Sequence, residues 1–157
     1  MSGITGADDN PGACSACLVE NLAWASGLAA SEGIILLIEP LNATDMPGYF
    51  LRSADQAAEI LRQVGTPNAQ LQYDLYHQQM SRGAVAENLR KHFGIIGHIQ
   101  IAGVPGRHEP DALQEINVSY IFGLIDDLGY NGWIGCEYRP RGTTESGLSW
   151  LKPHGIG

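Results

Sequence analysis

Basic residues are scarce in this sequence, and the first 51 positions contain neither lysine nor arginine. The chain of 157 residues has 9 lysines and arginines against 17 aspartates and glutamates, so its formal net charge is −8. Proteins bind the phosphate backbone of nucleic acids through surfaces that are rich in lysine and arginine. The charge therefore argues against a nucleic-acid partner.

Cysteine and long apolar runs are also scarce. The three cysteines, Cys14, Cys17 and Cys136, do not make the disulfide framework of a secreted protein. Cys14 and Cys17 have the C-x-x-C spacing, but no second pair completes a zinc site, so we interpret them as small residues entering a helix. No apolar run approaches the roughly 20 residues of a membrane span, and the N-terminus lacks a signal-peptide pattern. We therefore expect a cytoplasmic protein without a membrane partner.

Short apolar runs alternate with amphipathic segments along the rest of the chain. Apolar runs are typical of buried parallel strands, and helical spacing of apolar residues marks the segments between them. This alternation predicts a parallel sheet with right-handed crossovers. We expect one α/β domain over residues 1–151 and a flexible tail at 152–157. The expected strands are 34–38, 71–75, 95–101 and 133–138, and the expected helices are 18–32, 53–64, 84–93, 118–128 and 143–151.

Each expected strand leads to a polar side chain, and these four are Glu39, Asp74, Gln100 and Glu137. A doubly wound open sheet and a (β/α)8 barrel both fit the alternation, but only in a barrel do all strand ends converge on one mouth. We therefore predict a barrel. Four full strands, with a possible remnant at 2–5, are fewer than the eight that a barrel needs. The prediction is a partial (β/α)8 TIM barrel of four to five βα units.

The four strand-end side chains supply three carboxylates and one amide oxygen. Hard divalent cations such as Mg²⁺ or Mn²⁺ prefer oxygen ligands, whereas Zn²⁺ prefers histidine and cysteine. A solvated strand end would explain any one of these residues alone, but four in register favour a site. The sequence therefore predicts a Mg²⁺ or Mn²⁺ site at the mouth of the barrel.

Two further residues follow the strand ends closely. His77 lies three positions after Asp74 and could hydrogen-bond a substrate oxygen, although its spacing alone is more typical of a loop histidine that caps a helix. Arg107, in the loop 103–115, could hold a carboxylate through two parallel hydrogen bonds or could belong to a solvated turn. The loop 45–50 is long enough to cover the mouth. Spacing leaves both pairs of alternatives open.

Several motifs resemble those of the hydroxypyruvate isomerase family, which belongs to the xylose-isomerase-like barrel superfamily. The resemblance runs from about Leu18 to Leu151. It implies that the chain corresponds to the C-terminal part of the family's barrel, from about the fourth strand, without the first three βα units. It rests on the segments 37–42 (LIEPLN), 47–51 (PGYFL), 74–77 (DLYH), 98–110 (HIQIAGVPGRHEP) and 135–140 (GCEYRP).

The resemblance implies a role for each candidate residue. Glu39 and Glu137 would move the carbon-bound protons of the substrate as general base and general acid. Contacts with the substrate would be made by His77, Arg107 and His108. A divalent metal, Mg²⁺ or Mn²⁺, would polarise the substrate carbonyl and stabilise an enediolate. The ligands of that metal would be Glu39, Asp74, Gln100 and Glu137.

The reaction that the resemblance implies is the interconversion of hydroxypyruvate and 2-hydroxy-3-oxopropanoate (tartronate semialdehyde). A 2-oxo-tetronate isomerase or a ketose 3-epimerase of the same superfamily is an alternative, and Arg107 favours a small hydroxy or keto acid. The abasic-DNA nuclease of this superfamily uses a histidine-rich zinc site, which the few histidines and the net charge disfavour. A half-barrel without catalysis is a third alternative. Open sheet edges predict a homo-oligomer, or an N-terminal barrel segment as partner.

Overall fold

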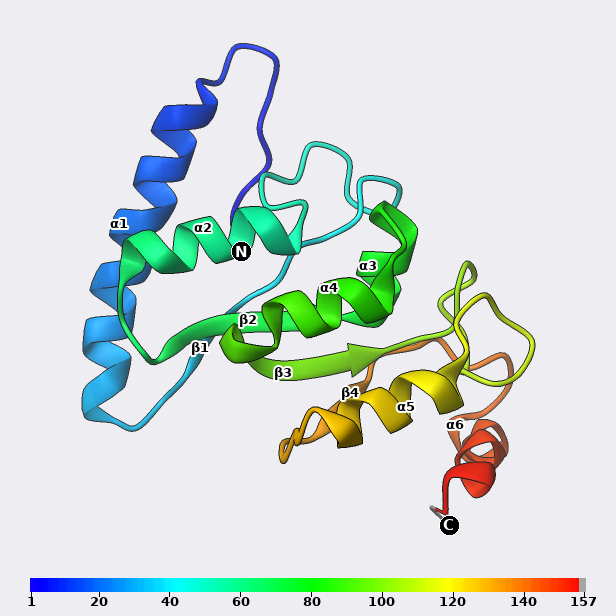
Figure 1. The fold of residues 1–157 in the computed structure, drawn as a ribbon. Helices are drawn as coiled ribbons and strands as arrows, with labels where there is room; N and C mark the ends of the chain where they lie inside the picture. Colours follow the sequence, from blue (N-terminus) through cyan, green and yellow to red (C-terminus); the bar gives the residue numbers. More distant parts are fainter. Residues whose placement is uncertain (156–157) are drawn as a thin grey trace.

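The chain folds around one parallel sheet of four strands (Figure 1). The computed structural model describes residues 1–155, and within them the sheet has the order β1-β2-β3-β4. The strands do not close into a barrel, because β1 and β4 form the two edges. This confirms the predicted α/β class and the partial barrel. The strands are β1 (Leu36–Ile38), β2 (Ala69–Asp74), β3 (Ile96–Ile101) and β4 (Ile134–Cys136).

Helices fill the connections between the strands, as the alternation predicts. They are α1 (Pro11–Ser31), α2 (Ala54–Val64), α3 (Leu75–Ser81), α4 (Val85–His92), α5 (Val118–Asp127) and α6 (Thr144–Gly147), with the 3-10 helices η1 (Phe93–Ile95) and η2 (Leu148–His154). The side chains of Asn10, Ser53 and Asn117 accept hydrogen bonds from the first turns of α1, α2 and α5. Gly65 ends α2 in the left-handed conformation, with a φ of 70°.

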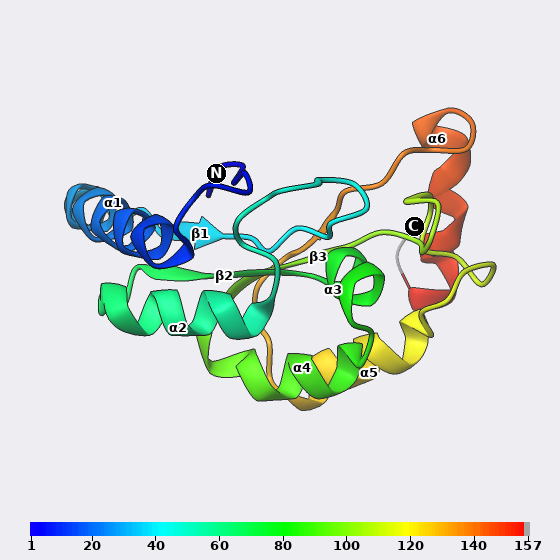
Figure 2. The same cartoon turned by 90° about the horizontal axis from the view of Figure 1, so that it is seen from above.

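The two faces of β2 and β3 differ in chemistry, because successive side chains of a strand point to opposite sides. One face is apolar, is at most 2% exposed, and consists of Leu71, Tyr73, Ile99 and Ile101. Figure 2 shows α2, α4 and α5 on one side of the sheet, and their apolar residues share a core with this face. The alternate side chains are polar and half-buried, namely Gln70, Gln72, His98 and Gln100.

The start of the chain differs from the expected boundaries. The first helix begins earlier than predicted, at Pro11, because Asn10 caps it and proline is favourable in a first turn. Ile34 and Ile35, expected in the first strand, lie outside it and are each 52% exposed. The N–H of Ile34 still donates to the carbonyl of Ala29, so the turn that ends α1 includes the first residue of the apolar run. The predicted strand 34–38 is therefore wrong at its beginning.

The sequence pattern does not predict α3. The expected strand 71–75 includes Leu75, whereas helix α3 begins there, directly after β2. Seven residues contain too little apolar periodicity to distinguish a short helix from a loop. The possible remnant strand at 2–5 makes only an isolated antiparallel bridge between Ile4 and Tyr49, so it is not part of the sheet.

The last described element is η2 (Leu148–His154), so residues 152–154 of the expected tail are helical. The flexibility expected for 152–157 stays a prediction, and residues 156–157 lie outside the described part. Cys14 and Cys17 lie in α1, as expected, and the three cysteines are free. Within residues 1–155, no helix is long and apolar enough to cross a membrane.

Candidate active site

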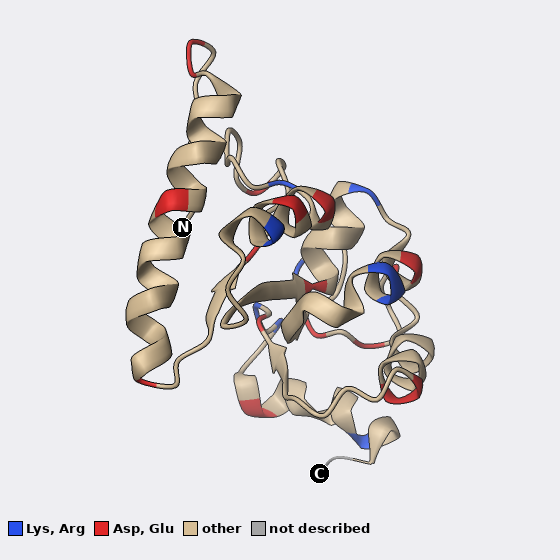
Figure 3. Cartoon of the chain, turned by 60° about the vertical axis from the view of Figure 1, so that its left-hand side comes forward, with Lys and Arg blue, Asp and Glu red and all other residues tan. Residues whose placement is uncertain are grey.

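The polar strand ends meet at one edge of the sheet. Glu39 follows β1, Asp74 ends β2, Gln100 is the next-to-last residue of β3, and Glu137 follows β4. The register places Asp74 beside Gln100, and Gln100 beside Gly135. Because the strands are parallel, their carboxyl ends lie on the same side. Figure 3 shows charged segments of both signs on the helices and loops around the sheet, whereas α1 carries a single acidic residue.

Asp74 combines a structural contact with a free oxygen. Its Oδ1 accepts a hydrogen bond from the Tyr76 N–H at 2.8 Å and so caps α3. Its Oδ2 is buried and has no hydrogen-bond partner among residues 1–155. Burial raises the pKa of the Asp74 carboxyl to about 6, although the Tyr76 N–H and the Arg107 guanidinium oppose this shift. The fold therefore keeps one carboxylate oxygen available to the site.

Glu39 supplies the second free oxygen, because its Oε1 is also buried and finds no partner in the described part of the chain. Burial raises the pKa of the Glu39 carboxyl to about 7. A hydrogen bond from Gln72 lowers this pKa, and the charges of Asp74 and Glu137 raise it. A carboxyl group with a pKa near 7 takes up and releases protons at neutral pH, which is the property of a general acid or base.

His77 lies within α3, not in a loop, and its hydrogen bonds fix its tautomer. Its Nδ1 accepts hydrogen bonds from the Asn42 backbone N–H at 3.2 Å and from Asn42 Nδ2 at 2.7 Å. The Asn42 amide is oriented by its Oδ1, which accepts a hydrogen bond from the Asp45 N–H. The ring proton is therefore on Nε2, 3.8 Å from Asp74 Oδ2. Burial lowers the pKa of His77 to about 4, so a neutral ring presents an N–H donor to the site.

Gln72 is a site residue that the sequence analysis missed. Its Nε2 donates a hydrogen bond to Gln100 Oε1 at 2.5 Å, and its side chain lies close enough to Glu39 to lower the pKa of that carboxyl. Gln72 thus lies beside two of the predicted metal ligands. The signal was present in the sequence, because Gln70, Gln72 and Asp74 alternate with apolar residues along β2 and so share one face.

Arg107 reaches into the site from the loop after β3. Its Nη2 lies 2.7 Å from Glu137 Oε2 and 3.8 Å from Asp74 Oδ2, and its Nη1 lies 3.7 Å from Asp45 Oδ2. The guanidinium carbon is 4.9 Å from the centre of the Tyr76 ring, within the range of a cation–π interaction. Its backbone φ of 53° is uncommon for a residue other than glycine. The Arg107 side chain is thus paired with the carboxylates rather than free in a solvated turn.

The loop predicted to cover the mouth is fixed to α3 through Asp45. Asp45 Oδ2 accepts hydrogen bonds from the Tyr76 hydroxyl at 2.8 Å and from Asn42 Nδ2 at 3.2 Å. Tyr76 therefore contacts both this loop and Arg107. The sequence analysis did not single out Asn42 and Tyr76, because their contacts with Asp45, His77 and Arg107 join residues from separate elements.

Glu137 and His108 lie farther out. The Glu137 side chain is 57% exposed and forms its ion pair with Arg107. The His108 Nδ1–H donates to the Arg139 carbonyl at 2.8 Å, so this nitrogen connects the loops after β3 and β4. The structure therefore places both residues beside Arg107, at the rim. Their predicted roles toward substrate and metal stay predictions.

Three potential ligand atoms come close enough together to hold a cation. Within residues 1–155, the side chains of Glu39, Asp74 and His77 each offer one such atom, all within 4.8 Å of one another. The two buried carboxylate oxygens without partners fit a divalent cation well. His77 fits less well, because its Nε2 carries the proton. Gln100 and Glu137 remain predicted ligands that lie outside this group of three.

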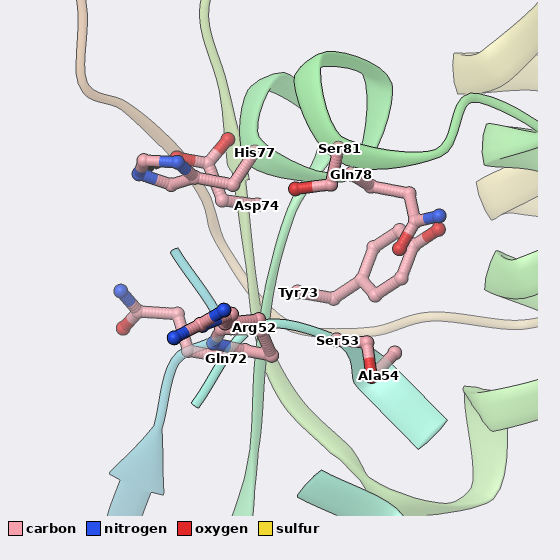
Figure 4. A pocket seen from close by; sticks show the side chains of 10 residues that line it. Arg52, Ser53, Ala54, Gln72, Tyr73, Asp74, His77, Gln78 and Ser81 are labelled. Carbon is pink, nitrogen blue, oxygen red and sulfur yellow. Dashed lines mark ion pairs between the residues drawn. The ribbon is translucent and has the colours of Figure 1, made fainter. Parts of the chain in front are cut away.

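A small pocket lies beside Asp74 and His77 (Figure 4). Figure 4 shows these two side chains next to each other, with Gln72 on the opposite side of the pocket. The wall also includes Arg52, whose Nε donates to the Tyr49 carbonyl at 2.7 Å. Arg52, the first basic residue of the sequence, thus brings a positive charge to a wall that Asp74 shares.

Comparison with known proteins identifies sequence relatives along nearly the whole chain. Residues 1–154 match the family model described as "Xylose isomerase-like TIM barrel". A 2-oxo-tetronate isomerase from Cupriavidus necator is 52% identical over 154 residues, which are 98% of this chain and 59% of that protein. The hydroxypyruvate isomerase of Escherichia coli is 45% identical over 139 residues, which are 88% of this chain and 54% of that protein. The chain thus spans little more than half the length of these relatives.

Solved structures have the same arrangement of strands and helices. A crystal structure from Brucella melitensis, described as an AP endonuclease of family 2, superposes with a TM-score of 0.91 at 42% identity, covering 97% of this chain and 59% of that chain. A 3-keto-D-glucoside 4-epimerase from Escherichia coli superposes with a TM-score of 0.81 at 19% identity, covering 94% and 57%. The second likeness concerns the fold alone.

Proposed function

Because this chain belongs to the xylose isomerase-like TIM barrel family, we propose that it is the metal-binding part of an isomerase that interconverts hydroxypyruvate and 2-hydroxy-3-oxopropanoate. The observation that carries the proposal is the pair of buried oxygens without partners on Glu39 and Asp74. They lie beside a neutral histidine donor and an arginine that is suited to a carboxylate. The relatives named as hydroxypyruvate and 2-oxo-tetronate isomerases support this class of reaction.

Glu39 and Asp74 would hold the divalent cation, with Gln100 and Glu137 as the further predicted ligands. Bound there, Mg²⁺ or Mn²⁺ would supply a Lewis acid for the substrate carbonyl. The protein buries two carboxyl groups at this position, and burial raises the pKa of both in the absence of a cation. Gln72 holds Gln100 through a hydrogen bond and lies beside Glu39.

The reaction moves a proton between neighbouring carbon atoms. A glutamate removes one proton from C3 of hydroxypyruvate, the C3 hydroxyl proton moves to the C2 oxygen, and a proton is returned to C2. The product contains the same atoms, with an aldehyde at C3 and a hydroxyl at C2. We assign the two carbon-proton transfers to Glu39 and Glu137, because both carboxylates lie at the strand ends, where the substrate would bind.

His77 and Arg107 hold the substrate in this scheme. The His77 Nε2–H donates to a substrate oxygen and stabilises the negative charge of the enediolate. Arg107 binds the substrate carboxylate through two parallel hydrogen bonds, and it exchanges its contact with Glu137 for this one. His108, next to Arg107 in the chain, is a further predicted substrate contact.

The same residues favour or disfavour the other activities known from the relatives. 2-Oxo-tetronate also has a carboxylate, so its isomerisation is the second candidate, supported by the relative at 52% identity. A neutral ketose would leave Arg107 without its carboxylate, which disfavours a 3-epimerase. An endonuclease activity, which the name of the Brucella melitensis structure suggests, is less well supported for this chain. Its group of three potential ligands has one histidine, and its net charge is −8.

We further propose that this unit acts within a complete barrel. The outer edges of β1 and β4 are unpaired within the sheet, and apolar side chains near them are exposed, including Ile35 at 52% and Trp133 at 88%. A second copy of this chain, or a segment that supplies the remaining βα units, would cover both edges. The three free cysteines favour a reducing cytoplasm as the compartment.

Proton exchange tests this proposal directly. Hydroxypyruvate in D₂O with Mg²⁺ should lose its C3 proton signals when the assembled protein is added, and 2-oxo-tetronate should lose its exchangeable carbon-bound proton more slowly. Glu137→Gln should abolish the exchange, and Asp111→Asn should leave it unchanged as a control outside the site. No exchange on either substrate, even with the complementary βα units of the Cupriavidus necator relative added, would contradict the proposal.

A further inference from the structure

The loops that follow β3 and β4 are joined to each other beside the site. The Arg139 N–H donates to the Arg107 carbonyl at 2.7 Å, and the His108 Nδ1–H donates to the Arg139 carbonyl at 2.8 Å. One loop carries Arg107 and the other carries Glu137, which are the two partners of the 2.7 Å ion pair. The junction of these loops therefore lies next to the ion pair of Arg107 and Glu137.

Glu109 is the buried anchor of this junction. It is 4% exposed, and its two carboxylate oxygens accept the Arg141 N–H at 3.0 and 3.3 Å, with Arg141 Nη1 at 3.5 Å. A Cβ atom at Gly147 would lie 2.5 Å from Glu109 Oε1, so α6 has a glycine where the carboxylate needs space. Burying a carboxylate is unfavourable unless partners of this kind compensate for it. The proposed reaction makes no direct use of Glu109.

Asp111 binds the same arginine in a different way. Its two carboxylate oxygens contact the Arg141 guanidinium at 2.5 and 3.5 Å, and its side chain is 27% exposed. Asp111 therefore holds the side chain of Arg141 at the surface, whereas Glu109 holds the backbone of the loop from inside. Substituting Glu109 and Asp111 one at a time therefore separates the effect of the loop's position from the effect of surface charge.

We propose that Glu109 is a positioning residue for Arg107 and, through Arg107, for recognition of the substrate carboxylate; this role rests on the proposed function. Glu109 lies two positions after Arg107, whose φ of 53° is held only by its surroundings. The Arg139 N–H fixes the Arg107 carbonyl from one side, and Glu109 fixes the neighbouring loop through Arg141 from the other. Without the Glu109 carboxylate, Arg107 is no longer held between Glu137 and Tyr76.

The first test uses the chain itself and needs no catalytic activity. In Glu109→Gln, the side-chain Nε–H signal of Arg107 in a ¹⁵N-edited NMR spectrum should shift or broaden, together with the Arg141 amide signal. In Asp111→Asn, the Arg107 signal should stay in place. An Arg107 signal that stays in place in Glu109→Gln, while the Arg141 amide moves, would overturn the proposal.

The second test uses the active assembly and separates positioning from stability. Glu109→Gln should raise KM for hydroxypyruvate roughly tenfold, with a smaller effect on kcat, because a displaced guanidinium binds the carboxylate poorly. In a protein that already carries Arg107→Lys, Glu109→Gln should raise KM no further, since both changes act on one contact. If no assembly isomerises any substrate, the proposed function fails, whereas the NMR comparison still decides the role of Glu109.

A second variant, Gly147→Ala, tests the same contact in case Glu109→Gln does not fold. Gly147→Ala leaves Glu109 in place but crowds its carboxylate, so it should shift the Arg107 signal in the same direction as Glu109→Gln. Thermal unfolding establishes whether each variant is folded. Loss of the fold in both variants would assign Glu109 to stability alone and would overturn the positioning role.

Discussion

The two faces of β2 and β3 belong to the same strands but serve different purposes. On the helix-covered face, Leu71 and Ile99 are fully buried. On the opposite face, Gln72 and Gln100 are hydrogen-bonded to each other and lead up to the carboxylates at the strand ends. The comparison indicates that one face stabilises the fold, whereas the other places polar groups where a substrate and a cation would meet.

The largest expected effect distinguishes neighbouring residues on the two faces. Leu71→Ala should lower the free energy of unfolding by about 2–5 kcal/mol, because it leaves a cavity in the core. Gln72→Ala should lower it by only about 1 kcal/mol, the usual worth of a hydrogen bond. Urea denaturation of both variants measures the two values. Equal losses would contradict the division of labour between the faces.

An intermediate effect concerns the pH dependence of stability without added metal. Glu39 and Asp74 have pKa values of about 7 and 6 in the fold, above their ordinary values of 4.5 and 3.8, so the folded state binds more protons and stability falls as pH rises. His77 has a pKa of about 4 in the fold, below its ordinary 6.5. Its contribution to stability therefore rises with pH between about 4 and 6.5, which opposes the effect of the two acids. Two acids outweigh one histidine, so unfolding should become easier between about pH 5 and 7.

Glu39→Gln should remove part of this pH dependence. Above pH 7 the variant should be more stable than the natural protein, by on the order of 2 kcal/mol, because it no longer buries a charge. Near pH 4.5 the two proteins should be equally stable. Glu32→Gln, at the exposed end of α1, is the matched control. If Glu39→Gln were less stable than the natural protein at pH 8, other groups in the fold would have to stabilise the charged Glu39 carboxylate.

The smallest expected effect on stability lies at the open edge of the sheet. Trp133 is 88% exposed beside β4, so Trp133→Gln should change the free energy of unfolding by less than about 0.5 kcal/mol. It should nevertheless weaken association, because it removes apolar surface that a partner would cover. Analytical ultracentrifugation measures the association. A monomeric natural protein, or unchanged association in the variant, would contradict an interface at this edge.

Much of the fold could be predicted from the sequence, because apolar runs separated by helical spacing have few alternatives to a parallel sheet. The family resemblance, read from the segments around Glu39, Asp74 and Glu137, is confirmed by the family-model match. Parallel pairing puts the carboxyl ends of the four strands on one side of the sheet, as expected. What the pattern could not give was α3, whose seven residues carry too weak a period, although it positions His77.

Other parts of the site depend on contacts between distant segments, and spacing along the chain does not report these. The tautomer of His77 is determined by Asn42, which precedes it by 35 positions. The ion pair between Arg107 and Glu137 spans 30 positions. Gln72 is different, because its alternation with apolar residues in β2 already marked it as facing the site.

The measurement that tests the account most directly is calorimetric titration of the chain with Mn²⁺. Asp74→Asn is the informative variant, because asparagine can still cap α3 through Oδ1 but loses the charge of the free oxygen. The account predicts one Mn²⁺ site in the natural protein and at least a roughly tenfold weaker site in Asp74→Asn, with Asp111→Asn unchanged. Equal affinity in Asp74→Asn and the natural protein, or no binding by the natural protein, would contradict a metal site at these strand ends.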